Sequence, residues 1–288
     1  MQPAAVALRR AIRRLGDGSR TTSAVITPSS SPSAARSSPS ESTILERPSS
    51  RKTLGFITIR SRRFLRSGRV RGVVVTVRDD VEAERAALAD SLEAVGPQAQ
   101  TACSDWTAFD LAAHVVAADR VAGVLAFCVR ALAARGVQFS PKPELADWVI
   151  RRQRRDGYHA LIARLRERSP RLLLAPRMAT FSLFELWMHH DDLTAANGIA
   201  HAVPEHLAEA IPWLVRYQAK RLPAARLVVR TTDNHEWTFG SDMRPAAVLT
   251  GPTADLVRWL AGRLPVTALN VEAEGTIAEQ LRVFVGTI

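Results

Sequence analysis

The sequence contains few lysines and few cysteines, and it has no long apolar run. Only three of its 39 basic residues are lysine, Lys52, Lys142 and Lys220, and only two residues are cysteine, Cys103 and Cys128. Two cysteines allow at most one disulfide, which is typical of a reducing compartment, so we expect a cytoplasmic protein. No apolar run reaches the roughly 18 residues that a membrane-spanning helix needs, so we do not expect a membrane partner.

Acidic residues are scarce in only one part of the chain. Residues 1–75 contain 15 Lys or Arg and 3 Asp or Glu, whereas residues 76–288 contain 24 Lys or Arg and 25 Asp or Glu. The formal net charge of +11 therefore comes from the N-terminal segment, and the nearly neutral remainder gives no sign of a nucleic-acid surface. With 288 residues, 47% of them hydrophobic, the chain can hold two domains and bury a sizeable core.

The segment 1–75 lacks the apolar periodicity needed to build a core. It is rich in Arg at both ends and in Ser, Pro and Thr between Thr21 and Ser50. Three interpretations stay open. The segment is a disordered or spurious extension, since 36 Arg against three Lys is typical of translation from GC-rich DNA; or it is an organellar transit peptide; or it is a basic arm for nucleic acid. We expect the folded protein to begin near Val75.

The stretch at residues 181–197 carries the residues that most strongly suggest chemistry. Its apolar residues recur at helical spacing, and Gly198 is a helix stop. Glu185 and His189 are four residues apart and lie on one face of the predicted helix, and Asp192 follows three residues later. Carboxylates and an imidazole among apolar neighbours are costly to bury unless they are paired or bind a metal. This face of the helix is therefore a candidate site.

A carboxylate and an imidazole at this spacing can supply two ligands to zinc or a similar ion. The best third ligand is His114, on the inward face of a second predicted helix, with Asp110 one turn before it. Three protein ligands leave one position open, as in catalytic zinc sites. His190 points about 100° away from His189 and is at best a substitute ligand or a group that contacts a ligand. The alternative is that Glu185 and His189 lie on an ordinary solvated helix face.

Two motifs resemble those of the mycothiol-dependent maleylpyruvate isomerase family, a branch of the DinB-like metalloproteins. They are Trp106-x-x-x-Asp-Leu-x-x-His114 and Glu185-Leu-Trp-x-His189-x-x-Asp192, followed by Gly198. The resemblance covers about residues 76–288. It implies a four-helix bundle that holds a divalent metal, usually zinc, followed by a small α/β domain similar to sterol carrier proteins. The family's His, Glu and His ligands correspond to His114, Glu185 and His189.

The predicted elements fit an α+β fold that is mainly α. Helices expected at about 79–95, 107–135, 144–168 and 181–197 would form the bundle, with the metal between facing helices. After a further helix at 204–222, strands are expected at 226–232, 235–239, 247–250 and 266–271, and helices at about 251–263 and 277–285. Asp233-Asn234 between the first two strands is a hairpin signal. We therefore predict three parts: the extension at 1–75, a metal-binding helical bundle at 76–203, and a linker helix with an α+β domain at 204–288.

The resemblance implies a metal- and thiol-dependent isomerase. Its mycothiol cofactor would bind the open metal position as thiolate, add to the cis double bond of maleylpyruvate, allow rotation and leave. We interpret Asp110 and Asp192 as groups that orient ligand imidazoles, although both could be ordinary polar positions. Two alternatives stay open for the whole chain: a mycothiol S-transferase used in detoxification, and a noncatalytic regulatory bundle with a structural metal. The expected partners are a low-molecular-weight thiol and a small-molecule substrate, but the sequence does not select the substrate or the arginine that binds it.

Overall fold

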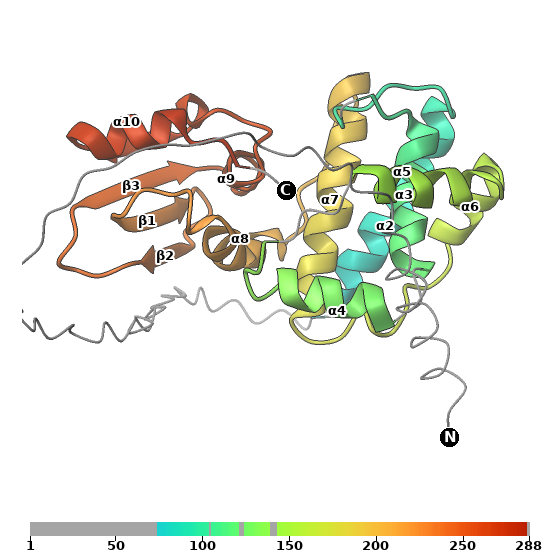
Figure 1. Ribbon diagram of the computed structural model, residues 1–288, viewed down its shortest axis with the longest axis horizontal. Coiled ribbons are helices and arrows are strands. Elements are labelled where there is room, and N and C mark those ends of the chain that lie inside the picture. Colours follow the sequence, from blue (N-terminus) through green and yellow to red (C-terminus); the bar gives the residue numbers. More distant parts are fainter. Residues whose placement is uncertain (1–73, 104, 121–123, 139–142, 287–288) are drawn as a thin grey trace, which may run out of the picture. The chain divides into compact units, whose positions relative to one another are not determined.

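The computed structural model describes residues 74–103, 105–120, 124–138 and 143–286 (Figure 1). The fold is α+β and mainly helical, as predicted. The predicted extension at 1–75 lies outside the described residues except for its last two positions. Within the described ranges, no helix is both long enough and apolar enough to cross a membrane.

The first described helix, α2, spans Val77–Val95, close to the predicted range. Thr76 caps it, because its hydroxyl accepts a hydrogen bond from the backbone N–H of Asp79 while the Asp79 carboxylate accepts one from the backbone N–H of Thr76. This capping box satisfies N–H groups that have no partner inside the helix. It therefore fixes the residue at which the helix begins.

Two of the predicted helices correspond to two described helices each. The predicted range 107–135 contains α3 (Ala108–Arg120) and α4 (Val124–Ala133), with residues 121–123 outside the described ranges. The predicted range 144–168 contains α5 (Pro143–Arg154) and α6 (Tyr158–Leu165). Gly157 separates these two with a φ of 84°, which a right-handed helix does not contain, so the prediction of one continuous helix was wrong there.

Helix α7 (Met178–Asn197) agrees with the prediction and ends at Gly198, whose φ of 65° is left-handed. Glycine adopts this conformation without the steric cost of a Cβ, which explains why the helix stops there. Helix α2 packs against both α7 and α6, and α3 packs against α5 and α6. These contacts build the helical part of the fold.

The chain after α7 forms the smaller α+β part. Its elements are η1 (Leu207–Ala210), α8 (Ile211–Gln218), β1 (Arg226–Thr231), β2 (Glu236–Phe239), β3 (Ala246–Gly251), α9 (Thr253–Leu260), η2 (Val266–Ala268), β4 (Asn270–Ala273) and α10 (Gly275–Val283). The sheet has the order β2-β1-β3-β4; β1 and β3 are parallel, and the two outer pairs are antiparallel. The result is a small mixed sheet accompanied by helices, which confirms the predicted α+β character.

Local details of this part confirm one prediction and correct two. The hairpin predicted at Asp233-Asn234 joins β1 to β2, and Asn234 has the positive φ, 71°, that such turns favour. The strand predicted at 266–271 begins only at Asn270, because the backbone N–H groups of Ala268 and Leu269 bond back to Pro265 and Val266 and form η2. The helix predicted at 204–222 is shorter, consisting of η1 and α8.

Helix α7 is buried on two faces that belong to different hydrophobic cores. Leu183 and Leu193 pack in the core formed with α2, α3 and α6. Phe184 and Trp187 pack in the other core, which holds apolar residues of η1, α8, α9 and the sheet. The helix thus contributes to both cores, which is why apolar residues surround its polar ones.

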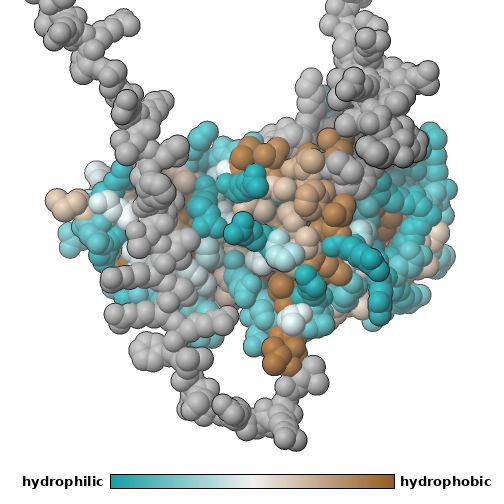
Figure 2. Space-filling model, turned by 90° about the horizontal axis from the view of Figure 1, so that it is seen from below, coloured by the Kyte–Doolittle hydropathy of each residue, from teal (hydrophilic) through white to brown (hydrophobic). Residues whose placement is uncertain are grey.

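The surface carries exposed apolar side chains among the charged ones. On the face drawn in Figure 2, apolar residues gather in the middle and hydrophilic residues lie around them. The large exposed apolar side chains of the described residues include Leu125 and Leu132 of α4 and Trp148 of α5. Exposed apolar side chains are common on soluble proteins, so their exposure alone identifies no partner.

Candidate metal-binding site

One pocket is lined by all three predicted metal ligands. His114 comes from α3, and Glu185 and His189 come from successive turns of α7. The rings of His114 and His189 meet edge to face, with 4.9 Å between their centroids. The cavity between these side chains is small, about 20 Å³. The three side chains that the sequence analysis selected therefore lie around one pocket.

The two imidazoles are neutral near pH 7. Burial, with the nearby His189 and Arg130, lowers the pKa of His114 to about 3. Burial, with the nearby Arg263 and Arg130, lowers the pKa of His189 to about 3. Neutral imidazole is the form whose nitrogen lone pair can bind a metal. The ring of Trp106, just before α3, lies 4.8 Å from that of His114 and helps to hold it.

Glu185 adds a carboxylate to the two imidazoles. Its Oε2 lies 3.3 Å from Nη2 of Arg130, which comes from α4. Arg130 offsets part of the carboxylate charge, so Glu185 can line the pocket even without an ion. Two neutral imidazoles and one carboxylate are a donor set that suits zinc or a similar first-row ion. The residue types therefore suit the metal that the sequence led us to expect. Among the described residues, however, the groups whose donor atoms all lie within 4.8 Å of one another are Glu84, His190 and His201, and Cys103, His189 and Asp192.

Asp192 lies close to His189 but does not bond to it. Its Oδ2 is 4.0 Å from Nδ1 of His189, too far for a hydrogen bond. The same oxygen accepts from Sγ of Cys103 at 2.8 Å, and Arg263 lies 3.2 Å from it. Sγ of Cys103 in turn lies 3.9 Å from Nδ1 of His189. The orienting role predicted for Asp192 is therefore indirect at most, since it acts on groups that touch the ring.

Cys103 is a poor competitor for an ion in this environment. Its thiol, with His189 and Asp192, lies within reach of a shared metal. Burial and the Asp192 carboxylate raise the pKa of Cys103 to about 12, so the thiol stays protonated and donates to Asp192. A metal binds the thiolate rather than the thiol. Nδ1 of His189 faces this thiol, which leaves Nε2 as the nitrogen for the pocket.

Asp110 does not orient His114. Its Oδ2 accepts from the hydroxyl and the backbone N–H of Thr107 at 2.7 and 3.1 Å, and its Oδ1 accepts from Arg154 at 2.6 Å. Thr107 and Asp110 therefore form a capping box at the start of α3. Among the described residues, no hydrogen bond joins Asp110 to His114, because both oxygens of Asp110 are used by the cap and by the ion pair.

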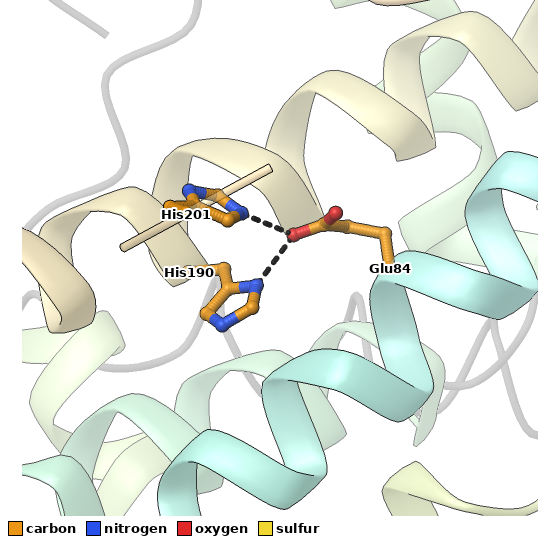
Figure 3. Close-up of side chains that lie close together, drawn as sticks. All are labelled: Glu84, His190 and His201. Atoms are coloured by element: carbon orange, nitrogen blue, oxygen red, sulfur yellow. Dashed lines mark hydrogen bonds and ion pairs between the residues drawn. The ribbon is translucent and has the colours of Figure 1, made fainter. Parts of the chain in front are cut away.

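Sequence reasoning gave no role to His201 and only a minor one to His190. Both rings point at the same oxygen of Glu84 in α2, as Figure 3 shows. The signal was present in the sequence, because Glu84 lies between Val81 and Leu88 on the apolar face of the predicted helix. A carboxylate on a buried face requires a partner. Which residues supply it depends on the tertiary fold.

Two family models match the chain and together cover most of it. The Mycothiol maleylpyruvate isomerase N-terminal domain matches residues 79–194, and the MDMPI C-terminal domain matches residues 194–279. The two matches meet inside α7, whereas the sequence placed a boundary after residue 203. None of the curated proteins compared with this chain matches it.

Two solved structures resemble the chain. One is a crystal structure of the mycothiol-dependent maleylpyruvate isomerase, 18% identical, covering 70% of this chain and 95% of the other, with a TM-score of 0.44. The other is a histidine-to-alanine mutant of that isomerase, which is 17% identical to this chain and has the same TM-score. The match covers 69% of this chain and 93% of the mutant chain. On the strength of the two family matches, the chain belongs to the mycothiol-dependent maleylpyruvate isomerase family.

Proposed function

We propose that this protein is a metal- and thiol-dependent enzyme that isomerises an unsaturated small molecule such as maleylpyruvate, with mycothiol as its thiol. In this proposal His114, Glu185 and His189 hold a divalent ion, most suitably zinc. One observation carries the proposal: two neutral imidazoles and a carboxylate from two helices line the same pocket. The family matches support the thiol and the reaction class, because both matched models describe mycothiol maleylpyruvate isomerase domains.

A divalent ion held at this position would lower the pKa of a thiol in its open coordination position, so that thiolate forms near neutral pH. The chain's own residues orient and shield that position. Val81, Val115 and Leu186 line the pocket and limit the water that can enter it. Less water strengthens the interaction between the pocket charges and a bound anion. The apolar wall therefore strengthens the attraction between a bound ion and a thiolate, which offsets the cost of taking that anion out of water.

The pocket narrows the choice of arginine for a substrate carboxylate to Arg85 and Arg130. Arg85 is already held by Asp119 and by the backbone carbonyl of Arg164, and only 5% of its side chain is exposed. Arg130 faces Glu185, whose charge a bound ion would largely neutralise. We infer that Arg130 then pairs with a carboxylate of the substrate. Replacing it with Gln should raise KM more than it lowers kcat.

The metal site is tested by counting ions in purified full-length protein. Replacing His114, Glu185 or His189 with Ala should remove about one equivalent of zinc, because each change deletes one of three ligands. His159 of α6 is the matched control, since it is an exposed histidine outside the pocket, and its Ala variant should keep all of the metal. Unchanged zinc content in the well-folded Glu185→Ala variant would refute the assignment.

The thiol chemistry is tested by replacing zinc with cobalt. Adding mycothiol should produce a sulfur-to-cobalt charge-transfer band and release about one proton, and neither should occur in metal-free protein. Turnover of maleylpyruvate should follow metal occupancy and fall at least about 100-fold in Glu185→Ala, since loss of even an outer-shell partner typically costs 10–100-fold. Thiol binding that consumes the thiol would support an S-transferase instead. A fully loaded protein with no thiol-dependent spectral change would point to a noncatalytic bundle.

A further inference from the structure

Glu84, His190 and His201 form a cluster that the proposed function does not use. None of the three lines the pocket of His114, Glu185 and His189. They come from three segments: α2, α7 and the connection after α7. One donor atom from each lies within 4.8 Å of the others. We propose that these three side chains form a second site for a divalent transition metal of the zinc class, with a structural role.

The donor atoms already converge on one point. Nδ1 of His190 and Nε2 of His201 lie 2.6 and 2.9 Å from the same oxygen, Oε1 of Glu84 (Figure 3). These are hydrogen-bond lengths, so a proton lies between each nitrogen and the oxygen. Around a tetrahedral zinc ion with bonds of about 2.0–2.1 Å, the donor atoms stand about 3.3 Å apart. An ion therefore fits in place of the protons if the donors separate by roughly 0.4 to 0.7 Å.

The second nitrogen of each ring has the partner that a metal ligand requires. Nε2 of His190 lies 2.8 Å from Oγ of Ser91, and Nδ1 of His201 lies 3.4 Å from Oδ1 of Asp191. Metal-binding histidines usually donate this other N–H to a carboxylate or another acceptor. In the metal-bound state, protons on Nε2 of His190 and Nδ1 of His201 would leave the lone pairs of the two opposite nitrogens free to bind the ion beside Glu84.

The surroundings hold the ligands in place and keep water away. The indole of Trp187 stacks on the ring of His201, with an angle of 19° between the planes. Arg258 of α9 donates two hydrogen bonds to Asp191 and so fixes the partner of His201. The side chains of Glu84, His190 and His201 are each only 5 or 6% exposed. A closed site of this kind is typical of structural rather than catalytic zinc.

The rival to a metal is an ion-pair network. Burial alone lowers the pKa of His201, but Asp191 and Glu84 outweigh it and raise that pKa to about 9, so without an ion the ring is charged near pH 7. Its charge and that of Arg258 then balance the carboxylates of Glu84 and Asp191, and an ion would have to displace a proton from the ring. Both states satisfy the buried polar groups, and they differ in what lies between Glu84 and the two rings. Ion counting separates them, because only the metal state binds zinc at this cluster.

The experiment titrates zinc into chelator-stripped full-length protein and counts bound equivalents for the parent, Glu185→Ala, His201→Gln and the double variant. We expect about two equivalents of zinc in the parent, one in each single variant and none in the double variant, because the two sites share no ligand. Glutamine at 201 keeps a side-chain donor for Glu84, which protects the fold. The matched control is His206→Gln, because His206 also pairs with a carboxylate of α2, that of Asp80, at 2.8 Å, and no third side chain of the described residues completes a metal-binding group there. That variant should keep both equivalents.

Failure of this proposal differs from failure of the proposed function. One equivalent in the parent that disappears in Glu185→Ala overturns the second site and leaves an ion-pair network. One equivalent that disappears in His201→Gln, but survives in Glu185→Ala, supports the second site and overturns the pocket site. Anomalous diffraction at the zinc edge from loaded parent crystals needs no variant. A peak among Glu84, His190 and His201 is expected, and its absence in fully loaded crystals overturns the proposal.

Stability gives a readout that does not depend on activity. An ion held by α2, α7 and the connection after α7 binds only the folded chain, so it must stabilise that state. In Glu185→Ala, zinc at about 100 times its Kd should raise Tm by roughly 5–10 °C. The same zinc should leave the Tm of the Glu185→Ala, His201→Gln double variant unchanged. An equal shift in both variants would contradict the site.

Discussion

Asp191 and Arg258 form an ion pair between α7 and α9, and breaking it should cost measurable stability. Arg258 donates to both carboxylate oxygens, at 2.6 and 2.9 Å. The Asp191 side chain is 6% exposed and that of Arg258 is 29% exposed. A two-point contact between charged groups, one of them buried, is stronger than the usual surface ion pair.

Two estimates of the free energy that this ion pair contributes to folding are similar. Hydrogen bonds to charged groups contribute about 1.5–3 kcal/mol, and exposed pairs about 0.2–1 kcal/mol, so a pair with a partly exposed guanidinium should contribute about 2 kcal/mol. Burial by itself raises the pKa of Asp191, but hydrogen bonds from Arg258 and His201 outweigh it and lower the pKa to about 2. Against about 3.9 in the unfolded chain, this shift allows at most about 2.6 kcal/mol, shared between the two partners.

The sign of the pH dependence follows from the direction of that shift. The pKa of Asp191 is lower in the folded than in the unfolded state, so the unfolded chain binds more protons at pH values between these two pKa values. The contribution of Asp191 is therefore fully present above about pH 4 and is lost as the pH falls through 2. In the Arg258→Gln variant the acid-induced loss should be smaller and should be complete at a higher pH, while its onset, which the unfolded-state pKa sets, stays the same.

The assay is a double-mutant cycle measured by urea unfolding of chelator-treated protein. The variants are Asp191→Asn, Arg258→Gln and the pair, and the expected coupling energy is about 2 kcal/mol. The control is Glu279 with Arg282 in α10, which has one contact at 2.6 Å but side chains 61% and 65% exposed. Its coupling should be about 0.5 kcal/mol or less. Equal coupling in both cycles would refute the reasoning, because burial of Asp191 would then add nothing.

Deleting residues 1–73 should leave Tm and metal content unchanged, because this segment carries excess charge but no core pattern; a drop of more than about 2–4 °C, which corresponds to roughly 1 kcal/mol, would contradict this. Gly262→Ala should destabilise the protein by roughly 3 kcal/mol or more in urea unfolding, because φ is 79° and a Cβ would strike the backbone carbonyl of Gly286. Iodoacetamide at pH 8 should label the exposed Cys128 and spare Cys103, whose pKa is about 12; mass spectrometry of the peptides decides, and equal labelling would contradict the assigned environment.

The features that sequence predicted well depend on local signals. Helix α7 and its end at Gly198 follow from apolar spacing and one glycine, and the hairpin at Asp233-Asn234 follows from a two-residue turn signal. His114, Glu185 and His189 meet in one pocket because helical periodicity places each on an inward face. The corresponding family motifs added the pairing between helices, which spacing alone does not give.

The features that sequence missed depend on competition between signals or on distant contacts. The apolar pattern around 144–168 concealed the Asp156-Gly157 turn that separates α5 from α6. Asp110 was expected either to orient an imidazole or to be an ordinary polar residue. One of its oxygens accepts from Thr107 and the other from Arg154, so neither is free to bond to His114. The cluster of Glu84, His190 and His201 joins residues more than a hundred positions apart. The carboxylate of Glu84 on an apolar face indicated that a buried partner must exist, but only the tertiary structure identifies His190 and His201 as the partners.

The two hydrophobic cores that share α7 limit how this protein can be recombined with others. Phe184 and Trp187 face the core of the α+β part, while Leu183 and Leu193 face the helical one. A chimera that kept the helical part and exchanged the rest would leave an aromatic face of α7 in water unless the new part matched its shape. The family matches also meet inside this helix, at residue 194. The two parts are therefore not interchangeable modules, and substitutions on either side of α7 must be compatible with the same helix.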